Sequence, residues 1–174
     1  AWIATTDDDA QFNRILRLPE GGLQTYSLLV RNGEIQLISG GTVLSGINIA
    51  DGDFHLISGV YDAAAMDLIL YVDGVEVARN PDVGTPPTGS EDLFIGTSNS
   101  SATNQFFDGA ISEVRLWNTA RSQGQIVETA VELDPGSHSD LTFFLAFDGT
   151  NATDYKNGAP ITRTGETHVE TVLF

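Results

Sequence analysis

The chain has 174 residues, an ordinary length for one domain, and is long enough to bury a core without disulfide or metal staples. It carries 24 Asp and Glu against 8 Lys and Arg, a formal net charge of −16, so we expect no nucleic-acid partner and no anionic membrane surface, whereas divalent cations are good partners. It has no cysteine, which excludes thiolate sites, and no apolar run of the roughly 18 residues that direct membrane insertion needs.

Short runs of β-branched and aromatic residues recur between Gly, Asn, Asp and Pro clusters, a pattern typical of an antiparallel sandwich and not of βαβ units. Asn32-Gly33 and Asp73-Gly74 each tolerate the positive φ angles of a two-residue type I′ turn, so they predict hairpins between 24–31 and 34–38 and between 68–72 and 75–79. In chain order, the expected strands are 2–5, 14–18, 24–31, 34–38, 54–61, 68–72, 75–79, 93–96, 110–117 and 141–147.

One segment has the pattern of a helix. Ser122 can act as its N-cap with Gln125 completing a capping box, and Ile126, Ala130 and Leu133 follow at helical spacing. The proline-rich segment 82–90 and the polar segment 97–105 predict surface loops. The predicted fold class is therefore all-β with one short helix.

Four successive segments resemble the strand motifs of laminin G-like domains, in the order and spacing of that family. They are Phe54–Asp62 (FHLISGVYD), Leu68–Ala78 (LILYVDGVEVA), Leu93–Gly96 (LFIG) and Phe107–Asn118 (FDGAISEVRLWN). The resemblance implies the fold of the concanavalin A-like lectin/glucanase superfamily, a two-sheet antiparallel jelly-roll sandwich.

The two ends depart from the usual order of such a domain. The family opens with an apolar-Phe-Asp strand and a Gly/Asn/Asp-rich loop before its Ala-Trp-Ile strand, whereas here Ala1-Trp2-Ile3 comes first and the similar segment 143–158 comes last. The last segment could complete the sandwich in permuted order, open a neighbouring copy, or belong to a domain split by an inserted module. Because a missing strand would expose a long edge, we expect residues 1–174 to form a single laminin G-like domain, permuted or split, trimmed from a larger protein.

The sequence lacks the usual catalytic patterns. By the resemblance, retaining glucanases of this fold carry Glu-x-Asp-x-Glu on one strand, which holds two carboxyls about 5–5.5 Å apart. No such motif, no Gly-x-Ser-x-Gly and no zinc-type histidine spacing occurs, and His55, His138 and His168 lie in unrelated contexts. We expect no enzymatic activity, and we expect His55 to be an ordinary satisfied strand residue.

Calcium is the metal that the sequence permits, since it takes carboxylate, amide and backbone oxygens on loops. The predicted ligands are four residues of one loop and, by the family resemblance, Asp108 near it; the loop residues are Asp148, Asn151, Asp154 and Asn157. Asp7-Asp8-Asp9 form a second candidate. The alternative is that these side chains only bond their own backbone in turns.

Sugar binding requires exposed aromatic rings beside polar groups. Trp2, Trp117, Tyr61 and Tyr71 lie in strand motifs, where core packing is the simpler explanation. Tyr155, within the Asp/Asn loop, and Phe106, next to a polar loop, are the predicted ligand-binding residues.

Two functions remain open. The first is a non-catalytic, calcium-associated binding module of a large secreted or cell-surface protein, similar to those of bacterial adhesins, that attaches to glycan or protein ligands. The second is a structural scaffold that displays an inserted or neighbouring domain. Both place the chain outside the cell, with neighbouring domains of the same protein as partners.

Overall fold

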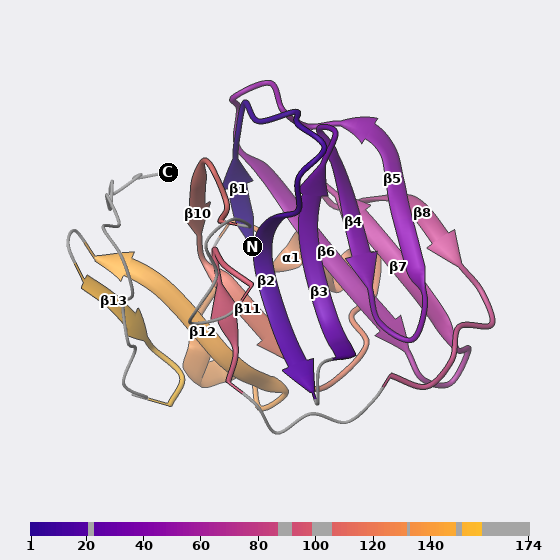
Figure 1. The fold of residues 1–174 in the computed structure, drawn as a ribbon. Coiled ribbons are helices and arrows are strands. Elements are labelled where there is room, and N and C mark those ends of the chain that lie inside the picture. The colour runs from indigo at the N-terminus through magenta and orange to yellow at the C-terminus, as the bar shows by residue number, and fades with distance from the viewer. Residues whose placement is uncertain (21–22, 87–91, 99–105, 132, 149–150, 158–174) are drawn as a thin grey trace.

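The computed structural model describes residues 1–20, 23–86, 92–98, 106–131, 133–148 and 151–157. Within these residues the regular secondary structure is almost entirely β-strand, with the short helix α1 (Gln123–Glu128) and the 3-10 turn η1 (Pro135–Ser137) (Figure 1). The strands are β1 (Trp2–Ala4), β2 (Asn13–Glu20), β3 (Leu23–Arg31), β4 (Glu34–Ile38), β5 (Thr42–Asn48), β6 (His55–Asp62), β7 (Asp67–Val72), β8 (Val75–Asn80), β9 (Phe94–Ile95), β10 (Ala110–Ser112), β11 (Val114–Trp117), β12 (Leu141–Asp148) and β13 (Asn151–Asp154).

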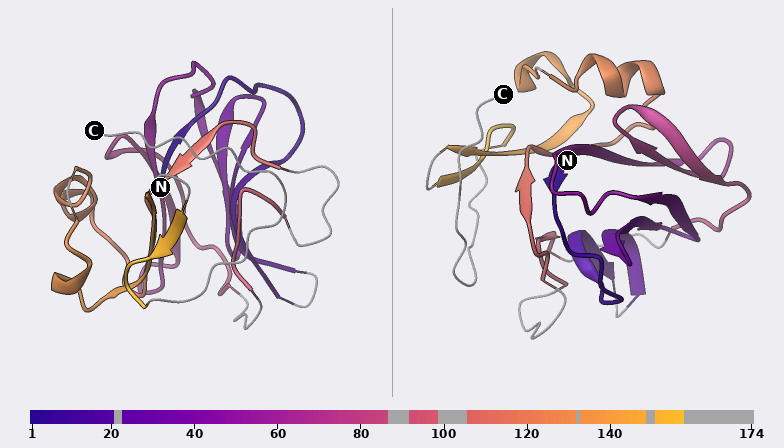
Figure 2. Two further views of the ribbon diagram at one scale, coloured as in Figure 1. Left: turned by 90° about the vertical axis from the view of Figure 1, so that its left-hand side faces the viewer. Right: turned by 90° about the horizontal axis from the view of Figure 1, so that it is seen from above.

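The strands form two sheets that pack face to face (Figures 1 and 2). The front sheet has the order β5-β4-β3-β2-β9 and the back sheet the order β10-β1-β6-β7-β8, and a three-stranded group β11-β12-β13 continues from the β10 end. All strand pairings of the described residues are antiparallel. The predicted two-sheet jelly-roll sandwich with one short helix is therefore confirmed.

The main core lies between the two sheets. Strand β7 is buried on both faces: Leu68, Leu70 and Val72 point towards the front sheet, and Ile69 and Tyr71 point the other way. This alternation follows from the two-residue period of a strand. Further fully buried side chains of the main core are Ile3, Ile15, Ile35, Leu37, Ile49 and Ile57.

Helix α1 covers the outer face of the back sheet, on the side away from the front sheet (Figure 2). Its buried residue Ile126 packs against Leu56, Val60, Ile69 and Tyr71, which together make a second, smaller core. The helix begins at a capping box, in which Ser122 Oγ accepts the Gln125 N–H at 3.4 Å and Gln125 Oε1 accepts the Ser122 N–H at 2.9 Å. Both the helix and its cap are confirmed.

Both predicted hairpins are present. Asn32 and Gly33 have φ angles of 53° and 72°, and Asp73 and Gly74 have 52° and 76°, as a type I′ turn requires. The flanking strands pair as β3 with β4 and β7 with β8.

Other predictions differ from the structure in where a strand or the helix ends, and two strands were not predicted. The expected strand 110–117 is broken at Glu113, whose φ of 50° lies outside the extended region, so β10 pairs with β1 and β11 with β12. The helix ends at Glu128 and does not reach Leu133, because the Thr129 hydroxyl bonds back to the Gln125 carbonyl at 2.9 Å. Strands β5 and β13 were not predicted: Ser, Gly and Asn interrupt the strand-forming residues of β5, and β13 is a short run of mostly low-propensity residues.

Candidate functional site

Asp154 and Asn157, two of the predicted calcium ligands, lie together where β13 ends. Asp154 is 1% exposed, and its Oδ1 accepts the backbone N–H groups of Phe144, Lys156 and Asn157 at 3.3, 2.9 and 3.3 Å. Its Oδ2 accepts the side-chain amide of Asn157 at 3.2 Å. These contacts are those of a carboxylate that stabilises a turn, the alternative considered above.

The other predicted calcium ligands lie apart or carry undescribed side chains. Asp108 is exposed ahead of β10, and its carbonyl accepts the Thr5 hydroxyl at 2.6 Å. Among the described residues, no hydrogen bond or ion pair joins Asp108 to Asp154 or Asn157. The backbones of Asp148 and Asn151 pair across β12 and β13, but their side chains lie outside the described part of the chain.

The acidic triplet 7–9 also makes turn hydrogen bonds. Asp7 accepts the Asp9 N–H at 2.9 Å and the Asn13 amide at 2.8 Å, and Asp9 accepts the Gln11 N–H at 2.7 Å. Throughout the described residues, no three His, Asp or Glu side chains gather closely enough to hold a metal ion. The described carboxylates are thus arranged as hydrogen-bond acceptors in turns and not as a preformed set of calcium ligands. The calcium site stays a prediction.

The two predicted ligand-binding rings are half exposed, 50% for Tyr155 and 51% for Phe106. The Tyr155 ring rests on Phe144, with 6.1 Å between centroids and 45° between planes. The Arg115 guanidinium lies 5.7 Å from the centroid of the Phe144 ring. Phe106 belongs to another segment, between β9 and β10. The Tyr155 ring is therefore half exposed and is supported by the ring of Phe144, an arrangement suited to stacking on a sugar.

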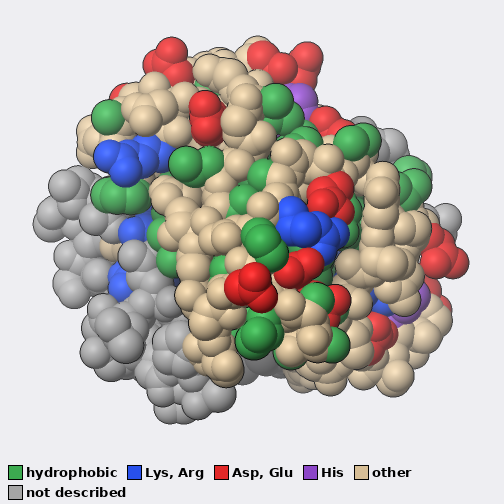
Figure 3. All heavy atoms as spheres, turned by 90° about the vertical axis from the view of Figure 1, so that its right-hand side faces the viewer, with side chains coloured by type: hydrophobic (Ala, Val, Ile, Leu, Met, Phe, Trp, Pro, Cys, Tyr) green, Lys and Arg blue, Asp and Glu red, His purple; other side chains and the backbone are tan. Residues whose placement is uncertain are grey.

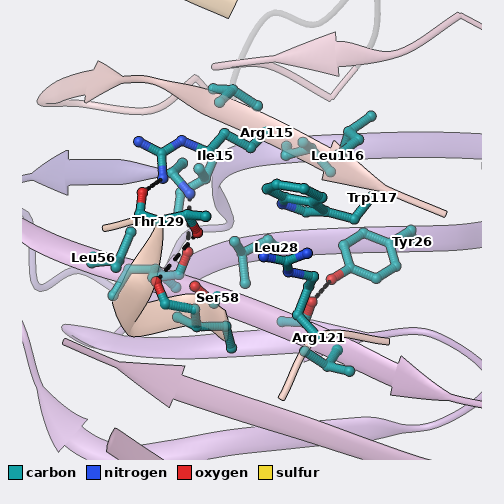
Figure 4. A pocket seen from close by; sticks show the side chains of 17 residues that line it. Ile15, Tyr26, Leu28, Leu56, Ser58, Arg115, Leu116, Trp117, Arg121 and Thr129 are labelled. Carbon is teal, nitrogen blue, oxygen red and sulfur yellow. Dashed lines mark hydrogen bonds between the residues drawn. The ribbon is translucent and has the colours of Figure 1, made fainter. Parts of the chain in front are cut away.

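A cavity of about 90 Å³ is lined by residues of β2, β3, β6 and β11 and by Arg121, Ile126 and Thr129 in and beside helix α1 (Figure 4). Tyr26 at its wall donates to the Gly59 carbonyl at 2.6 Å, and Arg121 lies 3.9 Å from the centroid of the Trp117 ring while donating to Asp140 at 3.0 Å. Small-molecule sites typically occupy about 300–1,000 Å³. At about 90 Å³, this cavity is smaller than such a site.

Three carboxyl groups have a lowered pKa, which favours the charged carboxylate that accepts hydrogen bonds over the protonated acid. The pKa values of Asp51, Glu76 and Asp140 all lie below the ordinary value, chiefly through hydrogen bonds from a backbone N–H, from Arg79 and from a threonine hydroxyl, respectively. A catalytic acid requires the opposite shift.

His55 has carboxylates at both ring nitrogens. Its Nδ1 lies 2.8 Å from Asp73 and its Nε2 lies 3.2 Å from Asp51. The interpretation of His55 as a satisfied strand residue is confirmed.

The outer face of the front sheet carries basic residues that the sequence analysis missed. We call Phe12, Arg14, Arg17 and Arg31 the arginine face. In a regular strand, residues 14 and 17 would point to opposite sides, but a bulge between Arg14 and Leu16 places both on the outer face. Phe12 lies between two guanidinium groups, 5.1 Å from Arg14 and 4.7 Å from Arg31. Only an irregular register, invisible in the sequence, creates this cluster.

The arginine face differs in its partners from the other arginines. Arg79, Arg115 and Arg121 each form an ion pair with a carboxylate, whereas no ion pair within the described residues includes Arg17 or Arg31. Arg17 instead donates to the Ser98 carbonyl at 2.9 Å, and Arg31 to the Ala10 carbonyl at 3.2 Å. This face is therefore a local positive region on an acidic protein.

Arg14 is the buried member of the arginine face. It donates to the Ser27 hydroxyl at 2.5 Å, and burial together with the charge of Arg17 lowers its pKa to about 10. Arg14 therefore keeps its charge at neutral pH.

Comparison with known proteins agrees with the observed fold. The laminin G model described as the concanavalin A-like lectin/glucanases superfamily matches residues 1–127. A solved structure of a presumed carbohydrate binding protein from Bacteroides ovatus ATCC 8483 superposes with a TM-score of 0.73 and 18% identity, over 91% of this chain and 48% of that one. The chain thus spans about half the length of that protein.

A second similar structure is an S-layer domain-containing protein (residues 221–444) from Clostridium thermocellum ATCC 27405, with a TM-score of 0.41 and 21% identity over 71% of this chain and 65% of that one. No curated protein sequence matches. No helix in the described residues is long and apolar enough to cross a membrane. On the family match and the observed sandwich, the chain belongs to the concanavalin A-like lectin/glucanases superfamily.

Proposed function

We propose that the chain is a non-catalytic carbohydrate-binding module of a secreted or cell-surface protein. The observation that carries this proposal is the half-exposed Tyr155 ring, supported from below by Phe144 on a lectin-type sandwich. The fold neighbour from Bacteroides ovatus, itself presumed to bind carbohydrate, supports the same ligand class. Adhesion through such a ligand is the role that we infer for the parent protein.

Three observations support binding without catalysis. The sequence lacks the Glu-x-Asp-x-Glu pattern of glucanases on this fold. Among the carboxyl groups of the described residues, those of Asp51, Glu76 and Asp140 have a pKa that is shifted downwards. The cavity of about 90 Å³ beside helix α1 is smaller than a typical small-molecule site.

In this proposal, calcium binds to the loop that joins β12 and β13 and to the turn after it. The proposed donors are Asp148, Asn151, Asp154 and Asn157, with Asp108 contributing from outside. Because Asp154 Oδ1 already accepts three backbone N–H groups, Oδ2 is the atom that could face a metal, after releasing the Asn157 amide. Calcium at Asp154 and Asn157 would then order the turn that contains Tyr155.

A glycan array probed with the protein, once with calcium and once with a chelator, tests the proposal. We expect bound glycans, and a loss of roughly tenfold in affinity in Tyr155→Ala, because stacking on an aromatic ring contributes about 0.5–1.5 kcal/mol beyond its buried area. Met66→Ala is the matched control, since its side chain is also about half exposed, in the turn between β6 and β7. A protein that binds no glycan under either condition would instead support the scaffold function.

A further inference from the structure

Basic residues are rare in this chain and unevenly placed. Of its 8 Lys and Arg residues, three lie on the arginine face, although the formal net charge of the whole chain is −16. Acidic side chains are spread over the neighbouring edge of the sandwich (Figure 3). Clustered like charges repel one another, so a bound anion on the arginine face would be stabilising.

The arginine face has unused hydrogen-bonding capacity. Arg17 Nε is buried without a hydrogen-bond partner, and so is Gln36 Oε1. Gln36 lies on the same face, because the register places Arg14, Leu29, Gln36 and Leu44 side by side across four strands. A buried donor or acceptor without a partner is costly, so both atoms fit a site completed by a polar ligand.

We propose that the arginine face binds an acidic saccharide, with its carboxylate or sulfate groups on Arg17 and Arg31 and its hydroxyl groups on the polar atoms of the sheet. Guanidinium groups suit both anions, because they offer paired donors in one plane. Phe12 and the half-exposed Leu44 supply apolar surface for the sugar ring. This inference rests on the proposed carbohydrate-binding function and narrows its ligand class.

The surroundings favour a saccharide over other anionic polymers. Asp7, Asp8 and Asp9 lie in the loop before β2, where the Asp9 backbone carbonyl accepts the Asn32 N–H at 2.6 Å from the turn that follows Arg31. At about 0.1 M salt, charges act over ~10 Å, so these carboxylates would repel a densely charged phosphate chain. A saccharide with spaced charges and many hydroxyl groups avoids that repulsion.

The test is calorimetric titration of the whole chain with short oligosaccharides. A hyaluronan oligosaccharide supplies carboxylates spaced by neutral sugars, a sparsely sulfated galactan oligosaccharide supplies sulfates, and carboxyl-reduced hyaluronan oligosaccharide is the neutral counterpart. We expect the acidic sugars to bind at least about tenfold more tightly than the neutral one, and more weakly as salt rises. Whichever acidic sugar binds more tightly identifies the anion.

Charge-removing variants locate the site. Arg31→Gln, at an exposed residue, should weaken binding of the acidic sugar on the order of tenfold, and Arg17→Gln by a similar factor if the variant folds. Arg79→Gln is the matched control, because Arg79 is also exposed and its variant makes the same charge change on β8. Its affinity should stay within about twofold of the parent.

Several results would overturn the inference. Equal binding of acidic and neutral sugars would refute it while leaving the proposed function intact, and so would equal losses in Arg31→Gln and Arg79→Gln. An oligonucleotide of matched charge that binds as tightly as the sugar would show a general anion site. If no saccharide of either kind binds, both the inference and the proposed function fail.

Discussion

At the scale of single residues, Asp154 is the carboxylate on which the turn after β13 depends. Replacing it with Asn removes the charge and the acceptor that Asn157 uses, while its three backbone donors keep at most a neutral oxygen. We expect Asp154→Asn to lower the free energy of unfolding by about 1–3 kcal/mol, measured by urea denaturation in the presence of a chelator. Asp134→Asn is the control, since this exposed residue accepts a single N–H, from Gly136. A variant that loses stability only when calcium is present would instead identify Asp154 as a metal ligand.

The His55 cluster makes stability depend on pH. Burial lowers the pKa of His55, but its hydrogen bonds to Asp73 and Asp51 outweigh burial and raise the pKa above 6.5. Because the pKa of the folded state exceeds that of the unfolded chain, the stabilisation is fully present below about pH 6.5 and is lost as the pH rises through the folded pKa. The cluster is largely solvated, so we expect a loss of less than about 1 kcal/mol between about pH 6 and pH 8.5.

Urea denaturation at these two pH values measures that loss. His55→Gln should remove most of the pH dependence, whereas His138→Gln, which leaves the cluster intact, should retain it. An unchanged pH dependence in His55→Gln would assign it to other groups.

Residue patterns predicted only part of the site. Tyr155, Asp154 and Asn157 lie together because they are near neighbours in sequence, so a loop rich in Asp and Asn was a sufficient signal. The joint position of Arg14 and Arg17 depends on a bulge, which is set by pairing with β3 and has no local signature. Recognition of the arginine face therefore needed the register.

At the scale of elements, helix α1 stabilises the sandwich through one buried side chain. Ile126 is 7% exposed against the outer face of the back sheet, whereas the next residue, Val127, is 53% exposed. We expect Ile126→Ala to cost about 2–4 kcal/mol of unfolding free energy in urea denaturation, because it leaves a cavity between the helix and β6 and β7. Val127→Ala, the matched control, should change it by less than about 0.5 kcal/mol. Equal effects of the two variants would mean that α1 does not hold the back sheet.

The elements that were predicted correctly are determined by residues close to one another in sequence. The turns at Asn32-Gly33 and Asp73-Gly74 and the Ser122 capping box depend on residues within a few positions of one another. The missed strands β5 and β13 also pair with sequence neighbours, β4 and β12, but Ser, Gly and Asn in β5 and the short polar sequence of β13 weaken the strand signal. The break at Glu113 has a long-range cause, because one stretch of chain serves two partners, β1 and β12. Propensity alone cannot anticipate such a tertiary effect.

At the scale of the whole molecule, the formal net charge of −16 opposes the compact state through self-repulsion. Sodium chloride should therefore raise the melting temperature by screening, with no site involved. Calcium at the same ionic strength should raise it further if the loop between β12 and β13 binds the ion, since a ligand present at about 100 times its dissociation constant adds about 2.7 kcal/mol.

Thermal denaturation in sodium, magnesium and calcium chlorides of equal ionic strength separates screening from specific binding. Magnesium is the control for divalent charge, because it demands stricter octahedral geometry and keeps its waters. We expect the extra stabilisation only with calcium, and its loss in the double variant Asp148→Asn, Asp154→Asn. Equal melting temperatures in the three salts would reduce the cation effect to screening. A calcium effect that survives in the double variant would move the site to Asp7, Asp8 and Asp9. Calcium bound there would neutralise carboxylates close to the arginine face, and would therefore strengthen the binding of an acidic sugar to that face.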